Sequence, residues 1–116
     1  MSELTILEGY EMGRIRLCTA ADVAEGQILK VEPEGMDPIA LCHVDGAFLA
    51  VEDECTHAIA SLSEGRLEGE VIFCPMHGGS FNVRSGKACS LPCKFPLKTF
   101  KVEVEGGDVW LLDGAA

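Results

Sequence analysis

Residues 39–51 read IALCHVDGAFLAV, and this stretch decides how the chain folds. Two apolar segments, 39–44 and 47–51, are separated by the dipeptide Asp45-Gly46. Asp-Gly is a strong signal for a two-residue turn between antiparallel strands, because both residues tolerate the positive φ that such a turn requires. The stretch therefore predicts a β-hairpin.

The sequence on both sides of the hairpin also divides into short apolar segments. Its 13 glycines and 5 prolines are spread along the chain, as is typical of strands joined by turns. No segment carries a long 3.6-residue apolar period, and helix is limited to a predicted single turn at 19–23. Further strands are predicted at 27–31, 71–73, 99–104 and 109–112. We therefore expect an all-β sandwich or barrel.

The large apolar side chains and two of the cysteines are expected to form the core. Phe48, Phe100 and Trp110 belong to residue types that are mostly buried. Cys18 and Cys42 lie in or beside apolar strands, and free cysteine is among the most buried residue types. These five residues therefore carry no functional argument.

Size and composition limit the chain to one domain. Its 116 residues are 47% hydrophobic and 24% charged, with a mean hydropathy of +0.20. This composition excludes disorder, and the length excludes two independent cores. No stretch approaches the ~20 apolar residues that span a bilayer, and the first residues lack the basic and apolar regions of an export signal. We expect a cytoplasmic protein that does not bind membranes.

The chain is strongly acidic, and its charge is unevenly distributed. Nine Lys and Arg against 19 Asp and Glu give a net charge of −10, which disfavours nucleic acid as a partner. Residues 71–102 contain no acid and five bases, namely Arg84, Lys87, Lys94, Lys98 and Lys101. Either these bases orient an acidic partner protein, or they form an ordinary solvated surface.

Two short segments concentrate the residue types that bind metals. Cys55 and His57 directly follow the hairpin, and Cys74 and His77 directly follow the predicted strand at 71–73. Six cysteines without an export signal indicate metal ligands and buried thiols, because the cytosol keeps thiols reduced. Two loops that each supply one thiolate and one imidazole form a pocket of two sulfurs and two nitrogens. Such a pocket fits either Zn²⁺ or a two-iron cluster.

The spacing of these four residues resembles the ligand pattern of the Rieske [2Fe-2S] family. It reads Cys-x-His, then sixteen residues, then Cys-x-x-His-Gly. The resemblance implies one Rieske-type [2Fe-2S] cluster as the cofactor. It implies that Cys55 and Cys74 bind one iron, and that His57 and His77 bind the other.

The resemblance extends from about residue 19 to residue 112, and 90–97 looks like the proline-containing loop that covers the cluster in this family. It implies a single domain over 1–116 with an all-β fold, a Rieske-type antiparallel β-sandwich. A small cluster-binding subdomain of two loops is expected at about 52–97.

High-potential members of the family carry four further groups around the cluster, and this chain lacks all of them. An extra cysteine in each ligand loop forms a disulfide there, and a serine and a tyrosine donate hydrogen bonds to the cluster sulfurs. The matching positions here look like Ile59 or Ala60, Met76, Gly79 and Phe81. Fewer donors stabilise the reduced cluster less, so we expect a potential at the low end of the Rieske span, about −150 mV.

The short chain and its pattern are similar to the ferredoxin components of bacterial aromatic-ring-hydroxylating dioxygenase systems. Residues 55–65 look especially like ferredoxins of the carbazole dioxygenase type. The resemblance implies a one-electron carrier between an NAD(P)H-dependent ferredoxin reductase and a terminal Rieske non-haem iron oxygenase that dihydroxylates aromatic compounds. It implies that the protein is not an enzyme alone and binds no small-molecule substrate.

Other interpretations use the same residues. The chief alternative is a structural zinc module that mediates protein interaction through the same Cys₂His₂ set. A third is the small subunit of an assimilatory reductase or of an arsenite oxidase. The intact ligands argue against the reductase subunit, and the missing export signal argues against the arsenite oxidase subunit. Cys89 and Cys93 could form a disulfide, but we expect two independent reduced thiols without a function.

Overall fold

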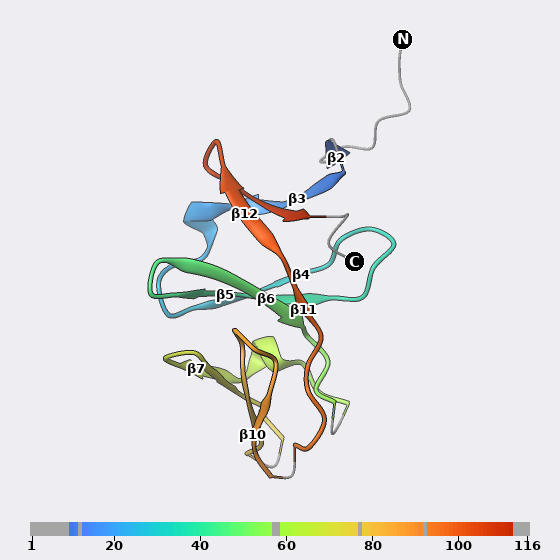
Figure 1. The fold of residues 1–116 in the computed structure, drawn as a ribbon, viewed down its shortest axis with the longest axis vertical. Helices are drawn as coiled ribbons and strands as arrows, with labels where there is room; N and C mark the ends of the chain where they lie inside the picture. Colours follow the sequence, from blue (N-terminus) through green and yellow to red (C-terminus); the bar gives the residue numbers. More distant parts are fainter. Residues whose placement is uncertain (1–9, 12, 57–58, 77, 92, 113–116) are drawn as a thin grey trace.

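The computed structural model describes five ranges of the chain, namely 10–11, 13–56, 59–76, 78–91 and 93–112. Within them the fold is three four-stranded antiparallel sheets that follow one another along the long axis of the molecule (Figure 1). Helix in these ranges is limited to two short 3₁₀ turns, η1 (Ala20–Asp22) and η2 (Leu62–Glu64). No helix in the described part is long and apolar enough to cross a membrane. The predicted all-β class is confirmed.

The central sheet is built on the predicted hairpin. Its strands are β4 (Ile28–Val31), β5 (Ile39–Val44), β6 (Ala47–Glu52) and β11 (Thr99–Phe100), in the order β11-β6-β5-β4. Strands β5 and β6 pair in register up to Val44 and Ala47. Asp45 and Gly46 have φ values of 50° and 79°, the positive values that the Asp-Gly signal predicts.

Strand β5 is buried on both faces, which explains why it reads as a nearly continuous apolar run. Successive side chains of a strand point to opposite faces. Ala40 and Cys42 pack into one hydrophobic core, whereas Ile39 and Leu41 pack into a second. The central sheet therefore lies between two cores, each shared with one of the other sheets.

The outer sheet closes the second core. Its strands, in the order β12-β13-β3-β2, are β2 (Tyr10–Glu11), β3 (Arg14–Thr19), β12 (Val102–Glu105) and β13 (Asp108–Leu112). The single strand predicted at 99–104 is two strands, because the chain passes from one sheet to the next at Lys101. Before that residue β11 pairs with β6, and after it β12 pairs with β13. The break lets Phe100 and Val102 contact the same core from different sheets.

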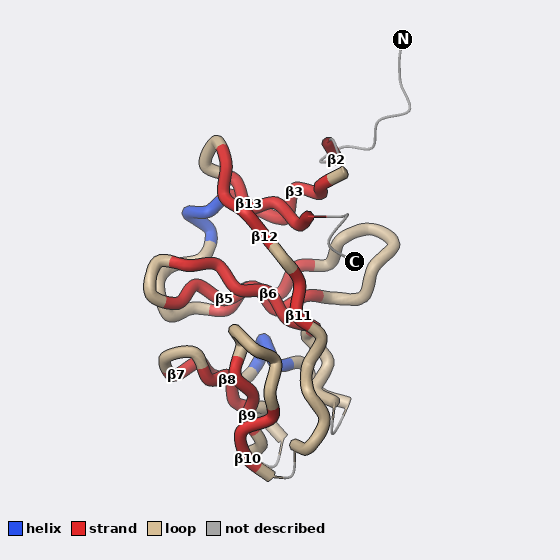
Figure 2. The backbone as a smooth tube through the Cα atoms, viewed as in Figure 1, coloured by secondary structure: helices blue, strands red, loops and turns tan. Residues whose placement is uncertain are grey.

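The third sheet carries the two segments with the candidate ligands. Its strands, in the order β10-β9-β8-β7, are β7 (Arg66–Glu68), β8 (Val71–Phe73), β9 (Ser80–Asn82) and β10 (Ala88–Ser90). It lies at the end of the molecule opposite β2, as Figure 2 shows. The sequence predicted only β8, so the expected subdomain of two loops is in fact loops mounted on a small sheet.

The core predictions hold for four of the five residues. Cys18 and Cys42 are buried, and Phe48 and Phe100 are partly buried against the second core. Trp110 is half-buried at the surface of β13, with the Arg14 guanidinium 4.0 Å above its ring. Its indole N–H donates to the Glu105 carbonyl oxygen at 3.3 Å. Trp110 is therefore an amphipathic surface residue covered by a cation, and the prediction that it belongs to the core is wrong.

Candidate metal centre

The first ligand segment is a loop between β6 and η2 with a rigid base. Buried Asp53 fixes the base, because its carboxylate accepts the Ser63 N–H at 2.8 Å and its carbonyl accepts the Leu62 N–H at 2.7 Å. Above this base the Cys55 N–H donates to the Ala60 carbonyl at 3.0 Å, which closes a six-residue loop. The side chain of Cys55 is 4% exposed and points inward.

The second ligand segment joins β8 to β9 and is closed in the same way. The Cys74 N–H donates to the Gly79 carbonyl at 2.8 Å, again across six residues. The Met76 N–H donates to the Cys74 sulfur. Backbone donors aimed at a ligand sulfur are one means by which proteins stabilise iron–sulfur clusters. Both loops therefore present a cysteine from the same position of the same kind of turn.

A third segment, 93–97, contacts both loops. The Thr56 hydroxyl donates to the Phe95 carbonyl at 2.9 Å, so this segment is bonded to the first ligand loop. The Cys93 N–H donates to the Ser90 carbonyl at 3.1 Å, and the Ser90 hydroxyl lies 2.7 Å from the hydroxyl of Ser80. The described part of the proline-containing loop predicted at 90–97 therefore lies against the first ligand loop, whereas Pro92 falls outside the described residues.

Three thiols meet under these loops. Cys55, Cys74 and Cys93 are each at most 4% exposed, and the sulfurs of Cys55 and Cys93 are 3.9 Å apart. Cys55 and Cys74 share a side-chain hydrogen bond. Burial raises the pKa of Cys74, and burial together with the nearby Cys55 raises the pKa of Cys93 to about 12. Apolar surroundings keep free thiols protonated, so a metal must supply the positive charge that stabilises the ligand thiolates.

The structure brings two of the four predicted ligands together. Cys55 and Cys74 are side by side, whereas His57 and His77 lie outside the described residues. Two adjacent buried thiols, with a backbone donor on one sulfur, fit the sulfur half of a mixed Cys/His iron–sulfur site. Cys89 and Cys93 do not face each other, because Cys89 is exposed and its thiol donates to the Lys87 carbonyl at 3.7 Å.

The proximity of Cys93 to the ligand thiols was missed from sequence. Its spacing to Cys89 drew attention to the wrong partner. No signal in the sequence reveals this contact, because it depends on how segment 93–97 folds against the ligand loops.

Exposed apolar side chains surround this end of the molecule. Four large ones stand on the ligand loops, on the third segment or just before it, namely Ile59 (94% exposed), Met76 (46%), Leu91 (74%) and Phe95 (69%). The bases of 71–102 are not gathered in the same way. Arg84 is paired with Glu70 at 3.1 Å, and the Lys98 ammonium lies 5.5 Å from the ring centre of Phe100. We call the four apolar residues Ile59, Met76, Leu91 and Phe95 the apolar rim.

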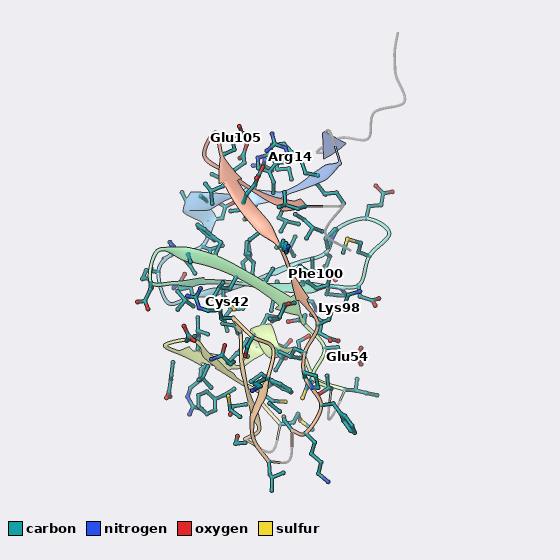
Figure 3. All side chains as sticks on the ribbon, viewed as in Figure 1. Arg14, Cys42, Glu54, Lys98, Phe100 and Glu105 are labelled. Atoms are coloured by element: carbon teal, nitrogen blue, oxygen red, sulfur yellow. The ribbon has the colours of Figure 1, made fainter. Side chains whose placement is uncertain are left out.

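A cleft of about 840 Å³ lies beside the first ligand loop, where Glu54, Lys98 and Phe100 are labelled in Figure 3. Its lining mixes both charges with apolar groups and includes Lys30 and Ile59.

The fold and this site define a small β-sheet metal domain of the iron–sulfur type. Two loops on one terminal sheet present buried thiols, and the remaining two sheets support them.

The comparisons with known proteins identify the family. Residues 13–101 match the model of the Rieske [2Fe-2S] domain. The chain is 50% identical to ferredoxin CarAc of Metapseudomonas resinovorans over 97 residues, which cover 84% of this chain and 91% of that protein. It is 47% identical to the ferredoxin component of biphenyl 2,3-dioxygenase of Rhodococcus jostii over 98 residues, covering 84% and 91%.

Solved structures agree. The chain resembles a chain in the complex of reduced oxygenase and oxidized ferredoxin of carbazole 1,9a-dioxygenase, with a TM-score of 0.83, 47% identity and coverage of 89% and 95%. The Sphingomonas yanoikuyae B1 ferredoxin gives a TM-score of 0.83, 40% identity and coverage of 86% and 97%. The chain belongs to the Rieske [2Fe-2S] domain family, and its cofactor is one Rieske-type [2Fe-2S] cluster.

Proposed function

We propose that the protein is the ferredoxin component of a bacterial aromatic-ring-hydroxylating dioxygenase system. It is an electron-transfer subunit and not a catalytic enzyme on its own. The observation that carries this function is the position of the paired thiols, which are buried at one end beneath exposed apolar side chains. The identity to ferredoxin components over nearly their whole length supports it.

We assign the cluster ligands to Cys55, His57, Cys74 and His77. The adjacent sulfurs of Cys55 and Cys74 support the first half of the assignment, and the spacing of the histidines from these cysteines supports the second. We also assign a single Rieske domain to 1–116, with the cluster-binding part at about 52–97. Its boundaries agree with the end of β6 and with the segment that closes over the thiols.

The surrounding residues hold the ligands and exclude water. When bound, the cluster supplies a centre that takes up and releases one electron. The backbone closures of the two loops fix the positions of Cys55 and Cys74. The Met76 N–H offsets negative charge on the Cys74 sulfur, and segment 93–97 covers the thiols. Donors and burial around the sulfurs are the means by which a protein sets a cluster potential.

The partners are a ferredoxin reductase and a terminal oxygenase, and we propose that the oxygenase docks on the apolar rim. A 47% identical ferredoxin is known in a complex with an oxygenase, which supports such a partner. Ile59 and Met76 belong to the same loops as the ligand cysteines, and Leu91 and Phe95 stand beside or on the segment that covers them. Docking there therefore leaves a short path for the electron. The rest of the molecule is acidic, and this charge affects the rate at which the protein and the oxygenase meet more than it affects their affinity.

The visible absorption and the electron paramagnetic resonance (EPR) spectrum of the reduced protein test this function. We expect a red-brown protein with a rhombic signal of low average g that disappears when oxidised terminal oxygenase is added. A colourless protein that contains one zinc would contradict the assignment and support the zinc module, which the comparisons do not favour. A coloured protein that never passes its electron to any Rieske oxygenase would retain the cofactor but refute the role.

We further propose a cytoplasmic location. Five cysteines, namely Cys18, Cys42, Cys74, Cys89 and Cys93, are thiols outside any disulfide in the structure, as is typical of a reducing compartment. Cell fractionation with an antibody to the protein tests this location.

A further inference from the structure

Cys93 is a buried thiol beside the proposed ligands that the proposed function does not use. It comes from segment 93–97, outside both ligand loops, and its side chain is 3% exposed. Its sulfur lies 3.9 Å from the sulfur of Cys55, within the range of a sulfur–sulfur hydrogen bond. A free cysteine in an ordinary core would be surrounded by carbon, but this one contacts another sulfur.

The second ligand loop has a space for this thiol. A Cβ atom at Gly79 would lie 2.2 Å from the Cys93 sulfur and 3.3 Å from its Cβ. Gly79 has no positive φ, so backbone conformation does not require glycine there. The glycine is needed because the Cys93 thiol occupies the volume that any larger residue would fill.

We propose that the Cys93 thiol donates a hydrogen bond to the Cys55 sulfur in the space left by Gly79, and that this bond raises the reduction potential of the bound cluster. The inference rests on the proposed ligand role of Cys55. A ligand sulfur is a thiolate and can only accept, whereas a free thiol carries one S–H donor. Of the two sulfurs 3.9 Å apart, Cys93 is therefore the donor.

The direction of the effect follows from charge. Reduction adds one negative charge to the cluster and its ligands, and a donor to a ligand sulfur interacts more strongly with the more negative state. Cys93 is thus a positioning residue that acts through Cys55, and its hydrogen bond supplements the Met76 N–H on the other sulfur. The low potential expected from the missing serine and tyrosine is accordingly raised by a donor that the sequence pattern does not reveal.

Cys93→Ser and Cys93→Ala form a matched pair, because the two products differ only by a hydroxyl group. We expect Cys93→Ser to keep a potential close to that of the wild type. We expect Cys93→Ala to have a lower reduction potential, because the equilibrium between oxidised and reduced cluster shifts about three- to tenfold toward the oxidised state. A tenfold shift corresponds to about 59 mV for a one-electron couple. Equal potentials in all three proteins, or an equal fall in both variants, would overturn the proposal and leave only a packing role.

Gly79→Ala tests the same contact from the other side. The added methyl group must displace the Cys93 thiol, so the potential should fall as it does in Cys93→Ala. In the double variant Gly79→Ala/Cys93→Ala, the methyl group of the new alanine at 79 enters the space that the Cys93 thiol has left. The reduction potential should therefore fall no further than in either single variant. Additive shifts would contradict the shared contact.

An infrared difference spectrum of the wild type, reduced minus oxidised, provides a measurement that does not depend on variants. We expect an S–H stretching band that moves to lower frequency on reduction and is absent in Cys93→Ser. A spectrum without an S–H difference band overturns the hydrogen bond even when the EPR signal of the cluster is normal. A wild-type protein without that EPR signal instead overturns the proposed function itself.

Discussion

The central and outer sheets are built, like the ligand end, from four-stranded antiparallel sheets; the ligand end is the sheet of β7, β8, β9 and β10 with its two ligand loops. Both regions share apolar cores, but they differ in strand length and in how the loops are held. The central and outer sheets bury long aliphatic side chains on strands of up to six residues, as in β3 and β5. Every strand of the ligand end has three residues, and backbone and hydroxyl hydrogen bonds fix its loops. Apolar burial supports the molecule, whereas directional bonds place the site. The two regions should therefore respond differently to the same kind of substitution.

The largest difference in iron content is expected between variants of two buried cysteines, one in a ligand loop and one on a strand of the central sheet. Cys74→Ala removes a proposed ligand and should abolish cluster binding. Cys42→Ala removes an equally buried thiol from β5 and should leave the cluster intact. Iron content and visible absorption after purification measure both. A Cys74→Ala protein with full iron content would refute the ligand assignment.

A large-to-small change in the second core should lower stability without changing the site. Leu41 is fully buried on β5, and Leu→Ala at such positions costs about 2–5 kcal/mol of unfolding free energy. We expect Leu41→Ala to unfold at lower denaturant concentration with an unchanged EPR spectrum. A changed g-tensor would show that the two regions are coupled more closely than this contrast supposes.

The apolar rim should matter for association and not for stability. Phe95 is 69% exposed, so Phe95→Ala should change the unfolding free energy by less than about 0.5 kcal/mol. Its loss from a docking surface should weaken binding of the oxygenase by about 1–2 kcal/mol, or about five- to thirtyfold.

The matched control is Val104→Ala on β12, where an exposed apolar residue stands on the outer sheet. We expect normal electron transfer to the oxygenase in this variant. Equal losses in stopped-flow reduction of the oxygenase by both variants would show that the rim is not the docking surface.

The smallest effect concerns the turn of the central hairpin. Glu25 accepts the backbone N–H groups of Asp45 and Gly46 at 2.6 and 2.9 Å, and these bonds lower the pKa of its carboxyl group below the ordinary value of 4.5. A lowered pKa means that the carboxylate adds stability above about pH 4.5, and that this stability disappears as the pH falls through the lowered pKa.

Glu25→Gln should therefore be slightly less stable than the wild type at about pH 7, and the difference should disappear as the pH falls through the lowered pKa of Glu25. Urea unfolding as a function of pH measures the difference. A gap that persists at low pH would assign the effect to side-chain packing.

Strong local signals were readable from the sequence alone. The Asp-Gly turn and its flanking strands were predicted because the turn chemistry is local. The adjacency of Cys55 and Cys74 followed from the family spacing. Strand β3 also alternates apolar and charged residues, but its two arginines obscured the pattern, since they pair with acids of β12 and β13.

Features that depend on tertiary contacts were not readable. The break at Lys101 arises because β11 and β12 find different partner strands, which no local pattern specifies. Trp110 is covered by Arg14, whose strand is distant in sequence. Cys93 reaches Cys55 only through the fold of segment 93–97 against both ligand loops.

Strand β5 has a consequence for cooperativity. Its alternate side chains belong to the two different cores, so neither core can open without losing part of the other. We therefore expect the ligand end, despite its three-residue strands, to unfold together with the rest of the molecule. Amide protons of β5 should exchange only through global unfolding, and a carrier built this way can change its charge repeatedly with little rearrangement of its frame.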